Sequence, residues 1–447
     1  MIGRLLHEGL IQYPNHIALI HGDAHVTYGH IGRLLPSLIE TWGKLAGKRV
    51  GVCTISPTAF VAAVGALDFL RSHAFLVRPR SLEELVRLKD TFAWDHIIRE
   101  EDVLAVSAAK DSSLGNSSDG SGLVTILTSG TTGIPKAVNH TWTTLASPVR
   151  KEERYADTRW LLTYPLHLYA GTQVFLQAVI NQASLVIPAS LDPIGICRAI
   201  RENRVTHASG TPTFWRQLVY FGPKEALQAC ELQQITIGGE VVPQELLDHV
   251  RLTFPRARIV HIYASSELGR VFSVTDGREG FPVKFLQDPP EEGVALRIVD
   301  GELMARGRNA MISYDRQKPL GKQSNGWMAT GDLVEVRGDR VVFTGRRNDV
   351  INVGGRKVSP LQVEATLRCL PGIIDVRVYA KKSSLTGNLV AADVVLAPGV
   401  CEETIGAELR QAASRTLQPH EVPRIVRVVP RVSVSEAVKI VRSEETS

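Results

Sequence analysis

The sequence predicts an α/β protein in which a large, multilayered N-terminal domain is followed by a small, mobile α+β domain. Its 447 residues are about three times a typical domain of about 150 residues. In the N-terminal part, short apolar strands alternate with helices, which favours α/β layering. The pattern changes near Gly345, after which the strands and helices indicate a second unit. We therefore expect a large domain over residues 1–345, a hinge at 346–348 and a small domain over 349–447.

The composition excludes several classes of protein. A hydrophobic content of 44% with 22% charged residues excludes wholesale disorder. The 51 Lys and Arg exceed the 46 Asp and Glu by only five, too few to suggest nucleic-acid binding. The five cysteines contain no C-x-x-C pair, which favours a reducing compartment over a disulfide framework or zinc site. No apolar run reaches the ~20 residues of a membrane span, and no secretory signal is evident. We expect a cytoplasmic protein.

The elements of the large domain follow from local patterns. Residues 17–28 form two short β-type runs that meet at Gly22-Asp23, which indicates a hairpin. Apolar residues at helical spacing predict a helix over 31–45, and a strand over 50–56 precedes an Ala-rich helix over 58–70.

Two further patterns divide the chain. Residues 107–122 are rich in Ser, Gly and Asp, which is typical of a solvated linker, and an apolar strand over 123–127 follows. In the small domain we expect a helix at 360–369, strands at 376–380 and 390–396, and a helix at 403–416.

The segment after the 123–127 strand carries the strongest chemical signal. It reads Thr128-Ser129-Gly130-Thr131-Thr132-Gly133-Ile134-Pro135-Lys136. Its glycines allow tight turns that point backbone N–H groups at an anion, and its lysine supplies positive charge for phosphate. The spacing differs from the Walker loop G-x-x-x-x-G-K-[ST], and a plain surface loop would rarely follow an apolar strand directly.

This segment closely resembles the phosphate-binding signature of the adenylate-forming acyl-CoA synthetase superfamily. Further motifs of that family follow in its order. They are Tyr263-Ala264-Ser265-Ser266-Glu267 (family Y-G-x-T-E), Gly301-Glu302-Leu303 with Tyr314 (G-E-L…G-Y), Trp327 to Leu333 (W-x-x-T-G-D), and Gly345 to Val358 (G-R-x-D-D…G-G). The resemblance covers nearly the whole chain.

The resemblance implies a ligase that uses ATP and Mg²⁺. Glu267 would hold Mg²⁺, a hard cation that prefers carboxylate oxygen. Lys136 would hold the β- and γ-phosphates, Tyr263 would stack on adenine, and Asp332 would accept both ribose hydroxyls. The complete set implied for ATP or AMP is Thr128, Ser129, Gly130, Thr131, Thr132, Gly133, Lys136, Gly238, Gly239, Glu240, Tyr263, Ser266, Asp332 and Arg346.

Other residues are assigned to the acid, the thiol and the domain motion. Pro165 to Gly171 resembles the segment that lines the family's acyl pocket, where His167 would guard the carboxylate. Asn348 would be the hinge, and Gly354 and Gly355 would line the path of the thiol. The expected acyl pocket is made of His167, Tyr169, Ser209, Gly210 and Gly238, whose small or polar character favours an aromatic or short acid.

The sequence departs from the family pattern at two places. Asn348 stands where the family usually has aspartate. The C-terminal signature P-R-T-x-x-G-K is also altered, because Lys439 lies nine positions after Pro430, and Val438 replaces the glycine. Lys439 is still the best candidate for the catalytic lysine, since no other lysine follows Lys382.

We therefore expect an ATP-dependent acid–thiol ligase whose acceptor is CoA or the phosphopantetheine of a separate carrier protein. Lys439, Lys136, Glu267 and His167 are its candidate catalytic residues. A degenerate adenylate-binding protein that senses or sequesters nucleotide is the alternative that the two departures motivate. An oxygen-using or reducing member of the superfamily has less support, because no nicotinamide motif is present.

Overall fold

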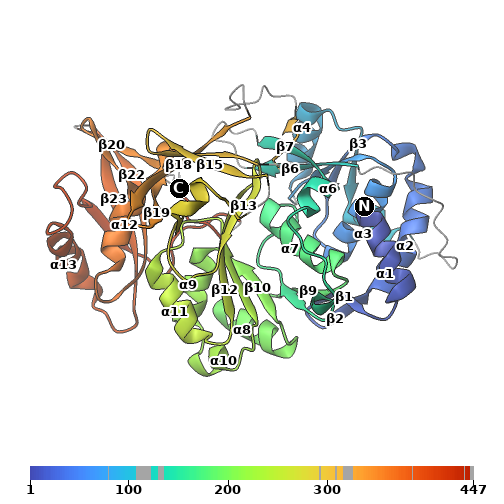
Figure 1. Ribbon diagram of the computed structural model, residues 1–447, viewed down its shortest axis with the longest axis horizontal. Coiled ribbons are helices and arrows are strands. Elements are labelled where there is room, and N and C mark those ends of the chain that lie inside the picture. Colours follow the sequence, from blue (N-terminus) through green and yellow to red (C-terminus); the bar gives the residue numbers. More distant parts are fainter. Residues whose placement is uncertain are drawn as a thin grey trace.

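The large domain is built from three sheets, and a small domain lies at its side (Figure 1). The computed structural model describes residues 1–78, 80–106, 122–128, 135–290, 293–307, 310–315, 326–384, 386–436 and 438–442. The linker expected at 107–122 falls, except for Gly122, outside these ranges. This arrangement confirms the predicted fold class, an α/β protein with a large N-terminal and a smaller C-terminal domain.

The first sheet has the order β13-β12-β11-β10-β8-β9-β1-β2. Its inner strands are parallel, and only the two edge strands are antiparallel to their neighbours. The β1–β2 pair, which turns at Gly22-Asp23, confirms the predicted hairpin. The strands are β1 (Ile17–His21), β2 (Ala24–Thr27), β8 (Arg159–Leu161), β9 (Ser184–Ile187), β10 (His207–Gly210), β11 (Gln234–Gly238), β12 (Arg258–Ser265) and β13 (Gly269–Val274).

The second sheet has the order β17-β7-β6-β4-β3-β5. Strands β6 and β7 are antiparallel, and Thr128 at the end of β6 is paired with Lys136 at the start of β7. The strands are β3 (Arg49–Cys53), β4 (His73–Leu76), β5 (His96–Arg99), β6 (Leu123–Thr128), β7 (Lys136–Thr141) and β17 (Ser313–Tyr314).

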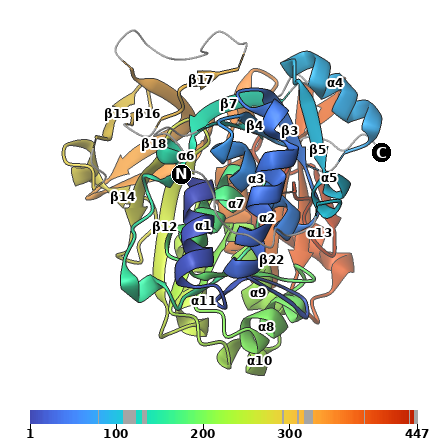
Figure 2. The same cartoon turned by 90° about the vertical axis from the view of Figure 1, so that its right-hand side faces the viewer.

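Helices fill the space between these two sheets. In Figure 2, α1 (Ile2–Gln12), α2 (Tyr28–Thr41) and α3 (Pro57–Phe69) lie beside one another, and with α7 (Tyr169–Ile180) they supply much of one continuous apolar core. Helix α2 begins before the predicted start at residue 31, because the Thr27 side chain accepts a hydrogen bond from the backbone of His30 and caps the helix.

The other face of the first sheet packs against helices α8 (Pro193–Glu202), α9 (Pro212–Phe221) and α11 (Gln244–Thr253). In Figure 1, α9 and α11 lie to the left of β12, and α8 lies below it. Shorter or peripheral helices complete this domain: α4 (Leu82–Phe92), α5 (Glu100–Leu104), α6 (Trp142–Ala146) and α10 (Lys224–Gln228).

A third, antiparallel sheet leads to the small domain. It has the order β14-β19-β18-β16-β15, with β14 (Phe281–Pro282), β15 (Ala295–Val299), β16 (Glu302–Arg306), β18 (Met328–Arg337) and β19 (Arg340–Arg346). The small domain has its own apolar core. Its elements are β20 (Ile351–Val353), β21 (Arg356–Val358), α12 (Pro360–Arg368), β22 (Ile373–Ser383), β23 (Gly387–Leu396), α13 (Glu402–Ala413) and β24 (Ile425–Val428).

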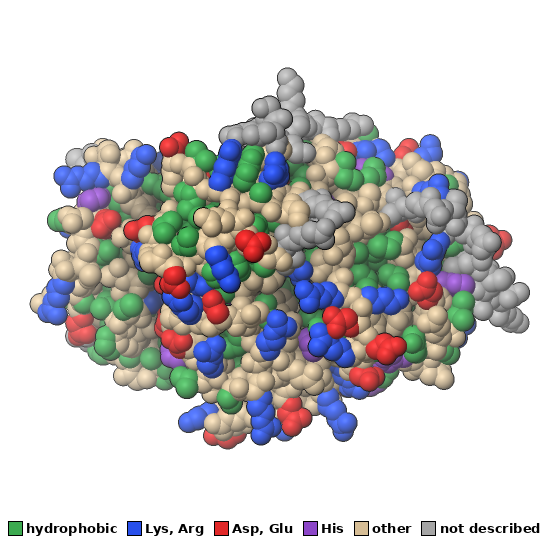
Figure 3. All heavy atoms as spheres, viewed as in Figure 1, with side chains coloured by type: hydrophobic (Ala, Val, Ile, Leu, Met, Phe, Trp, Pro, Cys, Tyr) green, Lys and Arg blue, Asp and Glu red, His purple; other side chains and the backbone are tan. Residues whose placement is uncertain are grey.

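The distribution of charged side chains on the surface agrees with the nearly balanced numbers of basic and acidic residues in the sequence. Figure 3 shows basic and acidic side chains interspersed over the face in view. Within the described ranges, every helix is too short or too polar to cross a membrane.

We predict that Asp393 is essential to the stability of the small domain. Its buried carboxylate pairs with the buried Arg377 at 3.2 Å and with Arg427 at 2.9 Å. Asp393→Ala removes an ion-pair partner of a buried cation, and we expect a loss of about 3–5 kcal/mol in the free energy of unfolding. Urea unfolding measures this loss. In the control Asp339→Ala, which breaks an exposed pair with Arg278, stability should hardly change; equal effects would contradict the prediction.

Candidate active site

A cavity of about 600 Å³ lies where the first sheet, the third sheet and the small domain meet. The parallel strands β10, β11 and β12 end at this point, the position at which open α/β sheets bind ligands. Predicted site residues from five separate segments line this cavity: Gly239, Glu240, Tyr263, Asp332, Arg346 and Lys439. Residues that are far apart in the sequence therefore line one cavity.

Asp332 organises one wall of the cavity. It lies on β18 opposite Arg346 on β19. Arg346 Nε donates to Asp332 Oδ1 at 2.7 Å, and the Tyr263 hydroxyl donates to Asp332 Oδ2 at 2.5 Å. Burial raises the pKa of Tyr263, and the charge of Asp332 raises it further, so the phenol keeps its proton and remains a donor. Both carboxylate oxygens are therefore fixed in direction.

The Tyr263 ring is part of an aromatic cluster. Its centroid lies 5.2 Å from the ring of Phe272 and 5.2 Å from that of Phe343, in stacked geometry with both. Stacking of Tyr263 on adenine stays a prediction.

The segment predicted to bind phosphate is described only near its two ends. Thr128 and Lys136 are paired across β6 and β7, and the Thr128 hydroxyl donates to the Lys136 carbonyl at 3.4 Å. Ser129, Gly130, Thr131, Thr132 and Gly133 lie outside the described residues.

Glu267 lies next to a strand that pairs with β7. The Tyr314 hydroxyl, on β17, donates to Glu267 Oε1 at 3.3 Å. In the described part of the chain, no three His, Cys, Asp or Glu side chains cluster closely enough to hold a metal ion. A single carboxylate still fits Mg²⁺, which is usually held by one or two carboxylates together with substrate phosphates.

Ser266 forms a hydrogen bond through its backbone carbonyl. Its carbonyl accepts a hydrogen bond from His140 Nε2 at 2.7 Å. Burial lowers the pKa of His140, so the ring is neutral at pH 7 and donates from Nε2. Sequence reasoning missed His140, because only the fold brings it to Ser266, 126 positions later in the chain.

Lys439 enters the cavity beside Gly239. A Cβ atom on Gly239, whose φ is +88°, would lie 2.8 Å from Lys439 Cε, so a side chain at this position would displace the lysine. Burial lowers the pKa of Lys439, while the carboxylates of Glu240, Asp332 and Glu267 oppose this effect. The structure therefore places the lysine of the altered C-terminal motif in the same cavity as Asp332, Arg346 and Tyr263.

Val438 reproduces the backbone shape that a glycine usually provides. Its φ of +53° is in the left-handed region, which costs a β-branched residue about 1–2 kcal/mol. Such a conformation persists only where the surrounding contacts impose it.

The predicted acyl-pocket residues are buried or half-buried. His167 Nε2 lies 3.3 Å from Glu436 Oε1 of the small domain, and burial lowers the pKa of His167. Ser209 accepts a hydrogen bond at its carbonyl from the Thr163 hydroxyl. Gly210 is needed for close packing, because a Cβ there would lie 2.3 Å from Phe214. Gly238 is likewise tight against Ile262, at 2.7 Å, and Tyr169 begins α7.

Asn348 lies in a single 3₁₀ turn, Arg347–Asp349, that directly follows β19. Arg347 Nη2 pairs with Glu302 Oε2 at 2.8 Å, which ties this turn to β16. Gly354 and Gly355 form the exposed β20–β21 turn with φ of +57° and +84°, and neither lines the cavity.

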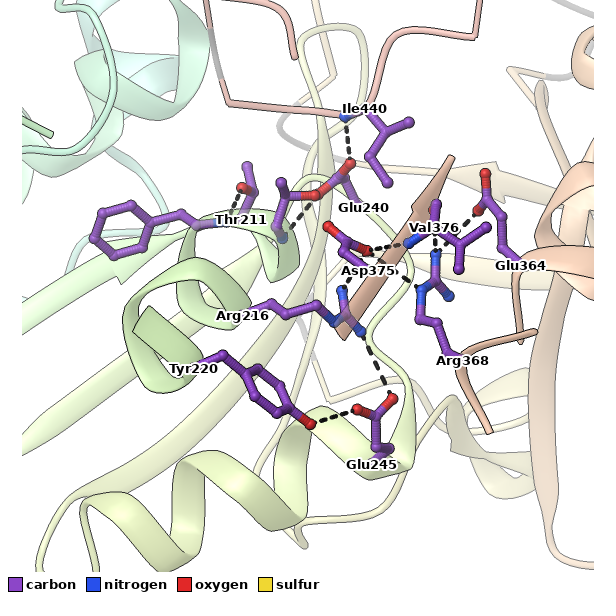
Figure 4. A network of polar contacts seen from close by, with 12 residues as sticks. Thr211, Arg216, Tyr220, Glu240, Glu245, Glu364, Arg368, Asp375, Val376 and Ile440 are labelled. Atoms are coloured by element: carbon purple, nitrogen blue, oxygen red, sulfur yellow. Dashed lines mark hydrogen bonds and ion pairs between the residues drawn. The ribbon is translucent and has the colours of Figure 1, made fainter. Parts of the chain in front are cut away.

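A network of buried charges connects the two domains (Figure 4). Arg216 on α9 lies 3.6 Å from Asp375, which lies 3.4 Å from Arg368 on α12. Glu364 on α12 accepts from Arg368 at 3.2 Å and from Arg442 at 2.7 Å. Sequence reasoning missed these residues, which belong to none of the quoted motifs.

Two family models match the chain. One, described as AMP-binding enzyme, covers residues 71–314, and the other, described as AMP-binding enzyme C-terminal domain, covers residues 362–439. Curated relatives include the 2-succinylbenzoate–CoA ligase of Bacillus subtilis, which is 24% identical over 96% of this chain and 95% of its own length. A 2-succinylbenzoate–CoA ligase of Staphylococcus aureus is 27% identical, over 71% of this chain and 65% of its own length.

Solved structures share the fold. The anthranilate CoA ligase AuaEII in complex with anthranoyl-AMP gives a TM-score of 0.78 at 18% identity, covering 98% of this chain and 95% of that chain. The o-succinylbenzoate CoA synthetase of Bacillus subtilis with its acyl-adenylate gives 0.73 at 21% identity, covering 99% and 98%. These comparisons give no support to the alternative of a degenerate nucleotide sensor.

We predict that Lys136→Ala and Glu267→Gln each lower the rate of adenylation at least about tenfold, or ~1.4 kcal/mol of barrier. Lys136→Ala removes a positive charge from the phosphates, and Glu267→Gln weakens the binding of Mg²⁺, whose charge would neutralise the departing pyrophosphate. ATP–pyrophosphate exchange measures the rate, and Lys151→Ala and Glu153→Gln are exposed controls. Normal exchange in both site variants would remove these residues from the site.

We predict that Asp332→Ala raises KM for ATP about tenfold, equivalent to ~1.4 kcal/mol, because a carboxylate that can accept two ribose hydroxyls is lost. Asp339→Ala, in the exposed β18–β19 turn, is the matched control. An unchanged KM in Asp332→Ala would mean that Asp332 only anchors Arg346 and Tyr263.

Proposed function

The chain belongs to the AMP-binding enzyme family as an AMP-forming acid–CoA ligase, and we propose that its acid is an aromatic or short carboxylic acid. The assignment of adenylation to this cavity rests above all on one observation, the position of Lys439 in the same cavity as Asp332, Arg346 and Tyr263. A cation there can approach the developing charge when a carboxylate attacks the α-phosphate of ATP.

In the first half-reaction, a carboxylate oxygen of the acid forms a bond to the α-phosphorus while the bond to the β-phosphate oxygen breaks. The products are acyl-AMP and pyrophosphate. We assign the loop of residues 128–136 and Lys136 to the β- and γ-phosphates, and the Ser266 hydroxyl to the α-phosphate. Bound Mg²⁺, held by Glu267, would neutralise phosphate charge. Lys439 is assigned to the reacting carboxylate and α-phosphate.

The nucleoside is assigned to the wall around Asp332. Its two carboxylate oxygens offer about four lone-pair sites, of which Tyr263 and Arg346 use one each. Two ribose hydroxyls can therefore be accepted without breaking the existing bonds. We assign the backbone of the segment Gly238 to Glu240 to the adenine, since glycine lets a flat ring approach the backbone. The Glu240 carboxylate is directed to Thr213 and Ile440 instead.

The acid is assigned to the pocket of His167, Tyr169, Ser209, Gly210 and Gly238. Relatives and structural neighbours named as 2-succinylbenzoate or anthranilate ligases support an aromatic acid.

In the second half-reaction, the thiol of CoA attacks the acyl carbon and AMP leaves. We propose that the small domain, residues 349–447, rotates against residues 1–345 about the hinge at 346–348 and brings Gly354 and Gly355 to the thiol. The thiol of a separate carrier protein is the other acceptor to test.

The acid is identified by incubating the enzyme with ATP, hydroxylamine and a panel of benzoate, anthranilate, 2-succinylbenzoate, butyrate and palmitate. We expect hydroxamate and pyrophosphate with an aromatic acid or with butyrate, and none with palmitate. Adding CoA or a phosphopantetheinylated carrier protein in separate reactions identifies the acceptor. Turnover of palmitate alone would contradict the proposed acid class.

We predict opposite defects in two variants. Proline fixes φ near −65°, so Asn348→Pro should freeze the hinge, leaving adenylation but abolishing thioester formation. Lys439→Ala should lose adenylation while still converting synthetic acyl-AMP and CoA to thioester. Each variant receives either acid with ATP or acyl-AMP with CoA. Loss of the same half-reaction in both variants contradicts the rotating-domain proposal.

A further inference from the structure

The segment that carries Lys439 is held by the large domain on both sides of the lysine. We call residues Val438 to Arg442 the strap. On one side, the Thr211 hydroxyl donates to the Val438 carbonyl at 2.5 Å. On the other side, the Ile440 N–H donates to Glu240 Oε1 at 2.7 Å. The two bonds reach the backbone immediately before and immediately after Lys439, and Figure 4 shows the bond at Ile440.

Both large-domain groups are themselves fixed in direction. Thr211 Oγ1 accepts from the Phe214 N–H at 3.0 Å, so its proton is free to point at Val438. The other oxygen of Glu240 accepts from the backbone N–H and the hydroxyl of Thr213, at 3.2 and 2.7 Å. Each of these two groups has a second partner at the start of α9. The orientation of its hydrogen bond to the strap is therefore fixed.

The strap is shaped by contacts within the small domain as well. The Val438 N–H donates to the Ser435 carbonyl at 2.9 Å, and the Ser435 N–H donates to the Lys439 carbonyl at 2.8 Å. Arg442 then binds Glu364 at 2.7 Å and Asp349 at 3.4 Å. This tight turn leaves Val438 with its positive φ, a strained conformation that outside contacts must maintain.

We propose that Thr211 and Glu240 are positioning residues that clamp the strap and so hold Lys439 in the cavity for adenylation. The inference rests on the proposed role of Lys439. Neither residue needs to touch the reacting atoms, because each acts on the backbone beside the lysine. Since the second half-reaction takes place after the small domain has rotated away, the clamp serves only the first.

The test separates the half-reactions in Thr211→Val and Glu240→Ala. Thr211→Val also removes the cap of α9, so Thr27→Val, which removes the cap of α2, is the matched control. Thr211→Ser keeps the hydroxyl and should restore the function. Glu225→Ala, on the exposed part of α10, controls for the loss of a carboxylate. Thermal unfolding checks that each variant is folded.

We expect both clamp variants to lower ATP-dependent hydroxamate formation at least about tenfold, while thioester formation from synthetic acyl-AMP and CoA changes less than about threefold. A second readout is independent of activity. Acetic anhydride is applied to the nucleotide-free protein, and acetylation of Lys439 is followed by peptide mass spectrometry. Release of the strap should expose the lysine and raise its acetylation rate severalfold over wild type and controls.

The outcomes distinguish the clamp from the function on which it rests. Suppose that Lys439→Ala loses adenylation while both clamp variants keep normal adenylation and normal reactivity of Lys439. That result overturns the clamp and leaves the proposed role of Lys439 intact. Normal adenylation in Lys439→Ala overturns the proposed role of the lysine, and the clamp with it. Equal losses in both half-reactions, or in Thr27→Val, would assign Thr211 and Glu240 a general structural role and overturn the inference.

Discussion

The ion pair between Asp332 and Arg346 fixes the part of the molecule on which the site depends. It joins adjacent strands of the third sheet, and the chain turns into the small domain immediately after Arg346. Because Asp332 also receives the Tyr263 hydroxyl, the same carboxylate connects the third sheet to the end of β12 in the first sheet. A single buried anion thus links the first sheet to the third sheet. The same anion forms part of the cavity wall and pairs with the residue at which the domain junction begins.

The ion pair between Arg216 on α9 and Asp375 on β22 crosses the boundary between the domains, and it is longer than the ion pairs inside the small domain. Arg216 approaches Asp375 at 3.6 Å, which is too long for a good hydrogen bond. Within the small domain, by contrast, Glu364 and Asp393 have partners at 2.7 and 2.9 Å. The short contacts between the domains are instead the hydrogen bonds of Thr211 and Glu240 to the strap, at 2.5 and 2.7 Å.

The sequence predicted the fold class and the strand before the loop of residues 128–136 because those features are local. The hairpin at Gly22-Asp23, the strand before Thr128 and the helix that begins at Pro360 follow from turn residues and apolar spacing. Thr211 and Glu240 could not be identified as partners of the strap, because they lie 227 and 200 positions away from it in sequence. Tyr314 was quoted within a motif, but its hydrogen bond to Glu267 depends on the pairing of β17 with β7.

Val438 shows what a glycine in a sequence signature stands for. The signature names a residue type, but the requirement is a dihedral angle that turns the backbone and delivers the next side chain. Here an aliphatic residue adopts that angle, at a φ of +53°. The neighbouring contacts offset the conformational free-energy cost, which a glycine would not have. A search for this family that demands the glycine would discard this chain, although Lys439 enters the cavity beside Asp332 and Arg346. Whether a segment can deliver its lysine is therefore better judged from backbone conformation than from residue identity.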